Sequence, residues 1–212
     1  MKYTVRAPKL LQAVYGKRLW RLPASEKVLY LTFDDGPVPE VTPWVLEQLA
    51  AYKAKATFFC IGDNIRKHPE VFQQVLNAGH RIGNHTQHHV KGWKTTPTEY
   101  LEEVALCQTE ILNAGARSED KLFRPPYGQL RSKQSRQLQR LGYKIVMWDI
   151  LSADFDTDLD GDACMENVLK YTKPGSIIVF HDSIKAQPRL EVALPAILNS
   201  FSEKGYEFRC IP

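Results

Sequence analysis

Short strand-like segments alternate with amphipathic segments along most of this 212-residue chain, and this alternation limits the folds open to it. The strand-like segments are rich in β-branched and aromatic residues, and they comprise residues 27–33, 56–61, 80–84, 121–124, 144–150, 176–180 and 206–211. The segments with helical periodicity comprise residues 42–53, 69–78, 97–114, 132–141, 162–171 and 189–204. Because neighbouring parallel strands are joined by helical crossovers, the pattern predicts an α/β protein with a mainly parallel sheet.

Polar residues follow the C-terminal ends of five predicted strands, and their number bears on whether the sheet is open or closed. They are Asp34 with Asp35, His85, Arg124, Asp149 with Asp154, and His181 with Asp182. An open sheet gathers ligands at one switch point between two or three strands. A barrel brings the C-terminal end of every strand to one mouth. Five such strands favour a TIM-like β/α barrel in a single domain, with seven strands instead of eight.

The first strand is preceded by an N-terminal arm, residues 1–26. Its Leu, Val and Trp residues predict that it packs on the barrel. Residues 27–212 then form the main domain. The sequence contains no apolar signal segment and no stretch long enough for a membrane span, so we expect a cytoplasmic protein.

The composition is that of an ordinary globular protein and excludes few partners. A net charge of +4 is too small to indicate nucleic acid. The densest basic stretch, residues 131–140, alternates with Gln, Ser and Leu, which is typical of the solvent side of an amphipathic helix. Four cysteines without metal or disulfide spacing are expected to be free thiols. The oligomeric state is not indicated.

Two adjacent carboxylates and a pair of histidines are candidate metal ligands. Asp34 and Asp35 repel each other at the end of an apolar run, so a fold that keeps both there uses them to bind a cation or to transfer a proton. The alternative interpretation is a solvated turn. His85 and His89 stand at i and i+4, which in a helical turn directs both imidazoles to one point. His88 is a third candidate. Two histidines and one carboxylate form a three-ligand site with open positions, as in catalytic zinc centres.

Two further elements carry polar residues at strand ends. His181 follows the apolar run of residues 177–180 directly, which places it at the predicted mouth as a candidate functional residue. The alternative interpretation is a structural histidine that a hydrogen bond holds at the strand end. Arg124 is followed by two prolines, which fix an extended backbone and remove two N–H donors. Such a backbone could hold the Arg124 side chain in place, and the alternative interpretation is that this segment is only a stiff surface loop.

Together these residues resemble the motifs of the polysaccharide deacetylases, the NodB-homology carbohydrate esterases. The chain has Thr-Phe-Asp-Asp-Gly-Pro at residues 32–37 and His85-Thr86-x-x-His89, which favours His89 over His88. Arg-Pro-Pro-Tyr follows at residues 124–127, and Ile178-x-x-His181 comes last. The motifs occur in family order, and the resemblance implies a distorted seven-stranded parallel β/α barrel.

The fourth family motif, Asp-x-x-Asp-Trp, is altered in this chain. Asp154 matches its second aspartate, but Leu151 replaces the first and Phe155 replaces the tryptophan. Trp148 and Asp149 are nearby and could compensate. The change affects one wall of the expected groove, and with it the substrate.

The resemblance implies a metal centre held by Asp35, His85 and His89. The metal would be Zn²⁺, with Co²⁺ or another divalent transition metal as an alternative, and its bound water would supply the nucleophile. Asp34 would be the general base, with Arg124 favouring its ionised form.

The remaining roles follow in the same way. His181 would be the general acid, with Asp154 as its carboxylate partner. The backbone N–H of Tyr127 would stabilise the oxyanion. The rings of Tyr127, Trp148 and Phe155 would bind the sugar.

The implied function is zinc-dependent removal of N-acetyl groups from N-acetylglucosamine-containing glycans, such as peptidoglycan or chitin oligosaccharides. One alternative is an O-acetyl esterase acting on a polysaccharide such as xylan. Another is a catalytically silent glycan-binding protein. A metallohydrolase of phosphate esters would need a second metal or more cations than Arg124 alone.

Overall fold

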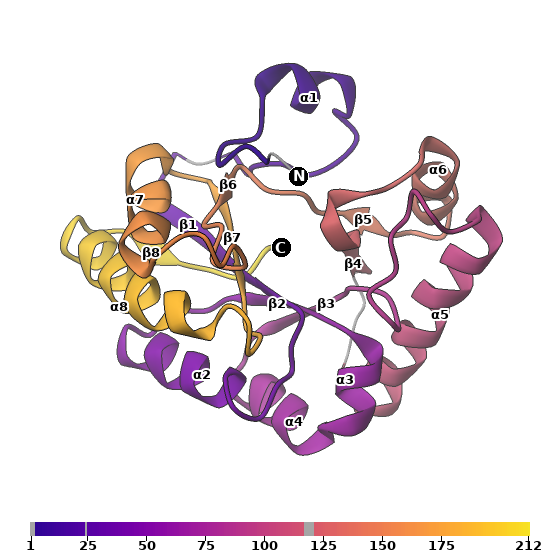
Figure 1. Ribbon diagram of the computed structural model, residues 1–212, viewed down its shortest axis with the longest axis horizontal. Coiled ribbons are helices and arrows are strands. Elements are labelled where there is room, and N and C mark those ends of the chain that lie inside the picture. The colour runs from indigo at the N-terminus through magenta and orange to yellow at the C-terminus, as the bar shows by residue number, and fades with distance from the viewer. Residues whose placement is uncertain (1–2, 24, 117–120) are drawn as a thin grey trace.

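A computed structural model describes residues 3–23, 25–116 and 121–212. Its parallel sheet consists of β1 (Val28–Asp34), β2 (Thr57–Cys60), β3 (Arg81–Asn84), β4 (Leu122–Phe123), β5 (Lys144–Ile145), β6 (Ile150–Leu151), β7 (Ile177–His181) and β8 (Glu207–Phe208). The order is β5-β4-β3-β2-β1-β7-β6, and β8 pairs with the start of β1. Figure 1 shows this sheet curling into an incomplete barrel with helices around its outside. The predicted parallel β/α barrel is confirmed.

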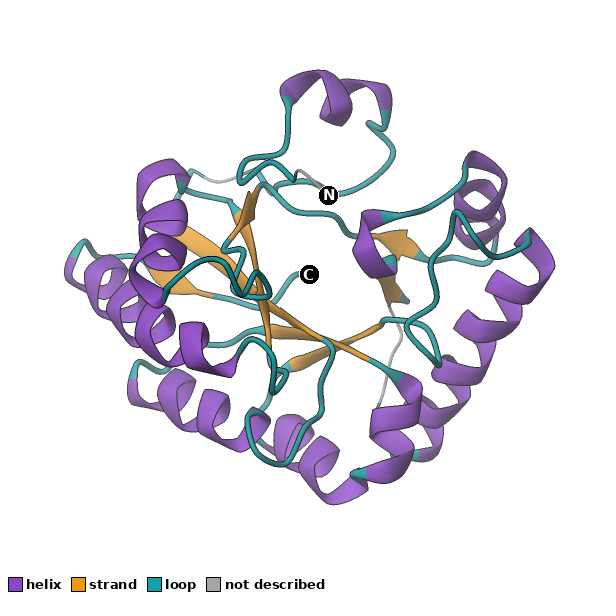
Figure 2. Ribbon diagram, in the orientation of Figure 1, coloured by secondary structure: helices purple, strands orange, loops and turns teal. Residues whose placement is uncertain are grey.

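The helices lie outside the sheet, and all but the N-terminal one form the outer layer of the barrel (Figure 2). They are α1 (Lys9–Val14), α2 (Thr42–Ala51), α3 (Gly62–Lys67), α4 (Pro69–Asn77), α5 (Pro97–Asn113), α6 (Ser132–Arg140), α7 (Gly161–Tyr171) and α8 (Gln187–Glu203), with a short 3₁₀ turn η1 (Pro126–Gly128). All six predicted helices are present, with ends that differ by a few residues. The sequence did not predict α1 and α3, because six residues are too few to show helical periodicity. Among the described helices, none is both long and apolar enough to cross a membrane.

The predicted fifth strand, residues 144–150, is wrong as a single element. Its two ends are separate strands, since β5 pairs with β4 while β6 pairs with β7 on the opposite edge of the sheet. Residues 146–149 cross the gap between the two edges. Periodicity could not reveal this change, because an apolar run stays apolar when its hydrogen-bonding partner changes.

The change of partner also moves Asp149 away from the mouth. Its backbone N–H donates to Ile177 at the start of β7, and its carboxylate accepts from Ser176 at 2.7 Å. Asp149 therefore lies at the N-terminal end of the neighbouring strand and cannot compensate for the altered fourth motif.

The two faces of β1 show how the sequence directs side chains. Leu29, Leu31 and Phe33 belong to the core between the sheet and the helices, where Phe33 stacks on Phe58 and Phe180. The alternate residues Tyr30, Thr32 and Asp34 must then face the barrel interior. The lower interior is filled by Phe59, Leu122, Val146, Ile177 and Ile211. The polar side chains of the interior therefore lie nearer the C-terminal ends of the strands, at the mouth of the barrel.

The N-terminal arm lies along the gap between β5 and β6 (Figure 1). Leu19 forms a bridge with Val146, and Arg6 forms one with Ile150. Ala7 and Trp20 are buried with residues of α5 and α6, whereas α1 contributes no buried residue. The arm therefore closes the gap through its two ends, and the helix between them projects outward.

Candidate functional site

The paired aspartates leave β1 in two different conformations, which places both carboxylates at the mouth. Asp34 ends the strand and faces inward. Asp35 has φ 85°, a left-handed conformation that turns the chain out of the strand. Its Oδ1 lies 3.2 Å from His89 Nε2 and 3.8 Å from His85 Nε2. This buried oxygen has no hydrogen-bond partner among the described residues, although a buried carboxylate oxygen normally needs one.

The histidine loop is not the helical turn that the spacing suggested. Thr86 and His89 have φ values of 65° and 54°, so residues 85–89 form an irregular loop after β3. Asn84 Oδ1 accepts from the Thr86 N–H at 3.0 Å, which holds the first bend. The two imidazoles converge because of these local bonds, with ring centroids 5.0 Å apart.

The protonation of His85 suits a metal ligand. Its Nδ1 lies 2.7 Å from the Arg124 carbonyl, so Nδ1–H donates there and Nε2 is left with its lone pair facing Asp35. Burial lowers the pKa of His85 well below its ordinary value and also lowers the pKa of His89. Both imidazoles are therefore neutral, as metal ligation requires.

His88 points away from this cluster. Its backbone N–H and its Nδ1 both contact the Glu103 carboxylate, at 2.9 and 3.0 Å. The ligand atoms of Asp35, His85 and His89 all lie within 4.8 Å of one another. Two imidazole nitrogens and an unpartnered carboxylate oxygen fit a divalent transition metal such as zinc.

Arg124 holds Asp34 in place from below. The guanidinium is fully buried over the Phe59 ring and donates to Asp34 Oδ1 at 2.6 Å and to Thr32 Oγ1 at 2.7 Å. Burial lowers the pKa of Arg124, while the Asp34 carboxylate opposes that shift. The second oxygen of Asp34 lies 4.0 Å from His85 Nε2, next to the metal cluster. One Asp34 oxygen is therefore fixed, and the other faces the site.

His181 at the end of β7 is paired with Asp154. Its Nδ1 lies 2.7 Å from Asp154 Oδ1, and its backbone N–H donates to Oδ2 at 2.8 Å. Burial alone would lower the pKa of His181, but the charge and hydrogen bond of Asp154, together with the charges of Asp35 and Asp34, outweigh it and raise the pKa to about 9. The imidazolium form is thus favoured at neutral pH, and Nε2–H is left free of the Asp154 contact.

The three expected sugar-binding aromatics lie in different settings. Tyr127, in η1, is 54% exposed, and its hydroxyl lies 3.1 Å from His89 Nδ1. Trp148 is half-buried and packs on Gly128, where an added Cβ would lie 2.8 Å from the indole. Phe155 meets His181 edge to face, with centroids 5.2 Å apart. Leu151, the other altered position, is buried in β6.

Asp182 is a buried carboxyl next to the site that sequence reasoning left without a role. It is fully buried and accepts from the Gly36 N–H at 3.1 Å and the Thr42 hydroxyl at 2.6 Å. A Cβ at Gly36 would lie 1.9 Å from Asp182 Oδ2. The carboxyl thus fixes the turn that follows Asp35. Burial, partly offset by the two hydrogen bonds, raises its pKa to about 8. The only sequence signal was its position beside His181.

Comparisons with known proteins point to one family. Residues 21–146 match the family model described as polysaccharide deacetylase. A peptidoglycan-N-acetylglucosamine deacetylase of Bacillus cereus is 36% identical over 194 residues, which cover 91% of this chain and 90% of the relative. A chitooligosaccharide deacetylase of Azorhizobium caulinodans is 33% identical over 162 residues, covering 76% and 77%.

A solved structure is similar along nearly its whole length. The crystal structure of the Bc1960 peptidoglycan N-acetylglucosamine deacetylase superposes with a TM-score of 0.87 at 29% identity. The superposition covers 95% of this chain and 94% of that one.

Proposed function

Because this chain belongs to the polysaccharide deacetylase family, we propose that it hydrolyses N-acetyl groups of N-acetylglucosamine-containing glycans with the help of a divalent metal, most simply zinc. The observation that carries the proposal is the convergence of three kinds of group at the barrel mouth. They are a neutral metal-ligand set, an aspartate with one free oxygen, and a histidine favoured as imidazolium.

Asp35, His85 and His89 would hold the metal. Such an ion polarises the substrate carbonyl and makes a nearby water more acidic. The unpartnered Oδ1 of Asp35 supports this assignment, because a cation would satisfy that oxygen. His85 is kept in the required tautomer by the carbonyl of Arg124.

Asp34 would take the proton of the attacking water. Its Oδ1 is held by Arg124, so Oδ2 is the oxygen that can accept. The water oxygen then bonds to the acetyl carbon, and the carbonyl oxygen gains negative charge. Tyr127, beside His89, would place its backbone N–H toward that oxygen.

His181 would protonate the leaving nitrogen. Asp154 occupies Nδ1, so the transferred proton is the one on Nε2. The carbon–nitrogen bond breaks as this proton arrives, and the products are acetate and a free amine. Asp154 therefore has two roles, because it orients the imidazole and keeps it charged until the transfer.

The amino-sugar substrate is supported by the relatives named as peptidoglycan and chitooligosaccharide deacetylases. The exposed ring of Tyr127 and the edge of Phe155 beside His181 are suited to the apolar face of a sugar ring.

The test is acetate release by the zinc-loaded protein from chitin oligosaccharides, peptidoglycan fragments, N-acetylglucosamine and acetylated xylan. We expect release from an amino-sugar substrate. Asp34→Asn should bind metal normally and lose about a hundredfold or more in rate. Release from acetylated xylan alone would instead favour the O-acetyl esterase. Unchanged turnover in Asp34→Asn would remove Asp34 as the base.

A further inference from the structure

Helix α1 exposes apolar side chains that nothing in the described protein covers. Leu10 is 77% exposed and Val14 is 67% exposed, and Leu11 lies beside them at 41%. None of the six residues of α1 is buried. In Figure 1 the helix lies outside the ring of barrel helices, above the gap between β5 and β6. An exposed apolar group of this kind commonly marks an interaction surface.

The helix is held firmly in this position by the chain on either side of it. The Ala7 N–H donates to Asp149 at 3.0 Å, and the Leu19 N–H donates to Ile145 at 2.8 Å. The buried Trp20 also donates its indole N–H to Tyr15 at 3.2 Å. Because hydrogen bonds hold both ends of the arm, the outward position of α1 is fixed. The exposure of Leu10 and Val14 is therefore a property of the fold.

Positive charge is concentrated around the same helix. Residues 3–23 contain five Lys or Arg and no Asp or Glu. Residues 121–148, which include α6 and β5, contain six Lys or Arg besides Arg124, which is buried against Asp34, and again no acidic residue. The rest of the chain carries an excess of acidic residues, so the modest net charge conceals a strong separation of charge.

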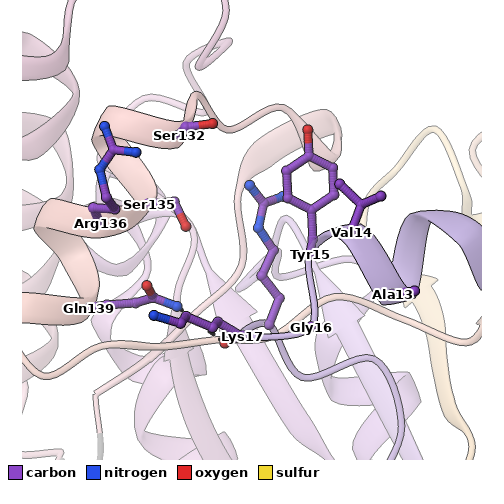
Figure 3. A pocket seen from close by; sticks show the side chains of 10 residues that line it. Ala13, Val14, Tyr15, Gly16, Lys17, Ser132, Ser135, Arg136 and Gln139 are labelled. Carbon is purple, nitrogen blue, oxygen red and sulfur yellow. Dashed lines mark hydrogen bonds between the residues drawn. The ribbon is translucent and has the colours of Figure 1, made fainter.

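A hollow of about 590 Å³ lies where the arm meets α6. Figure 3 shows Val14 and Tyr15 of the arm on one side and Ser132, Ser135 and Arg136 of α6 on the other, with Lys17 drawn below them next to Gln139. The Arg18 guanidinium lies 4.2 Å above the Tyr15 ring and fixes that side chain. Two cations and two hydroxyls are suited to a phosphate group, and the apolar residues of α1 lie next to them.

We propose that Leu10, Leu11, Val14, Lys17 and Arg136 form a docking surface for a bilayer of anionic phospholipids. This arm surface would insert its three aliphatic side chains among the headgroups, while Lys17 and Arg136 contact lipid phosphates. Apolar insertion combined with surrounding basic residues is the pattern of interfacial membrane binding. A soluble polyanion would use the charges but not the aliphatic side chains, and a neutral protein partner would not need the charges.

The experiment is co-sedimentation of the full chain with vesicles of phosphatidylglycerol and phosphatidylcholine, compared with phosphatidylcholine alone. We expect binding to the anionic vesicles only. The triple variant Leu10→Ser/Leu11→Ser/Val14→Ser and the double variant Lys17→Glu/Arg136→Glu should each lower the partition coefficient about tenfold. Matched controls are Leu106→Ser/Leu112→Ser on α5 and the pair Lys53→Glu, just after α2, and Lys170→Glu on α7, all at exposed positions.

Circular dichroism and thermal melting would establish that each variant is folded, which is expected because the changed side chains lie on the surface. Failure of the wild-type chain to sediment with anionic vesicles would overturn the proposal. So would equal binding by the triple variant, since the surface would then act through charge alone. Because no step depends on acetate release, the result is independent of the proposed catalysis.

Discussion

Replacing Asp154 by Asn should alter the dependence of activity on pH more than it alters activity itself. Asn keeps the size of the side chain and can still accept from Nδ1–H of His181, but it removes the negative charge at 2.7 Å. That charge and its hydrogen bond hold the pKa of His181 at about 9, against an ordinary value of 6.5. Without the charge, burial lowers the pKa while Asp35 and Asp34 still raise it, so we take the ordinary value of 6.5 for the variant.

The size of the effect follows from the protonated fraction of His181. The general acid works when protonated, so its activity is present below its pKa and is lost as the pH rises through it. At about pH 8, a group with the wild-type pKa is about nine-tenths protonated, whereas the variant is about one-thirtieth protonated. We therefore expect about a thirtyfold loss of kcat/KM at about pH 8 and a loss of less than about twofold at about pH 6.

Two assays test this reasoning. The pH profile of kcat/KM locates the alkaline limb in the wild-type and variant enzymes at the same metal loading, since a bound cation lowers both pKa values. An NMR titration of the His181 imidazole in metal-free protein measures the shift directly. Asp156→Asn is a matched control, because Asp156 contacts Tyr3 and not His181. An equal loss at both pH values would refute the electrostatic role and leave Asp154 as a purely structural residue.

Three further predictions concern the metal ligands, the turn after β1 and the arm. His89→Ala should weaken zinc affinity by more than about a hundredfold in a chelator competition assay, while His88→Ala should change it by less than about threefold, because His88 bonds to Glu103; a similar loss in His88→Ala would contradict the ligand set. Asp182→Ala should lower the free energy of unfolding by about 2 kcal/mol in denaturant titrations, because it leaves the buried Gly36 N–H without an acceptor. Asp182→Asn should lose much less, and equal losses in the two variants would mean that the hydrogen bonds contribute little. Trp20→Ala should cost about 3 kcal/mol, since its buried indole anchors the arm against α5 and α6, and an unchanged denaturation midpoint would show that the arm is not part of the folded unit.

Much of the fold could be predicted because it depends on local chemistry. The alternation of residues along β1 decides which side chains face the helices and which face the barrel interior, and so places Asp34 inward. The order of helices and parallel strands follows from the same periodicity. The motif residues stand next to strand ends in the sequence, so their arrival at one mouth follows once the sheet is parallel.

Other features were decided only by contacts between distant segments. The split of residues 144–150 into β5 and β6 depends on two different neighbouring strands, and neither is specified by the apolar pattern itself. The histidine pair converges through left-handed residues and the Asn84 side chain, which residue spacing alone cannot reveal.

Asp182 illustrates the same division at the level of one side chain. The sequence by itself determined that a polar residue follows His181 at the end of a buried strand. Only the tertiary structure decided that this carboxyl turns away from the mouth to bind Gly36 and Thr42, far away in the chain. The physical reason is that a buried polar group is stable only when it has a hydrogen-bond partner. Which groups lie within hydrogen-bonding distance is decided by the packed fold and not by the neighbouring residues in the sequence.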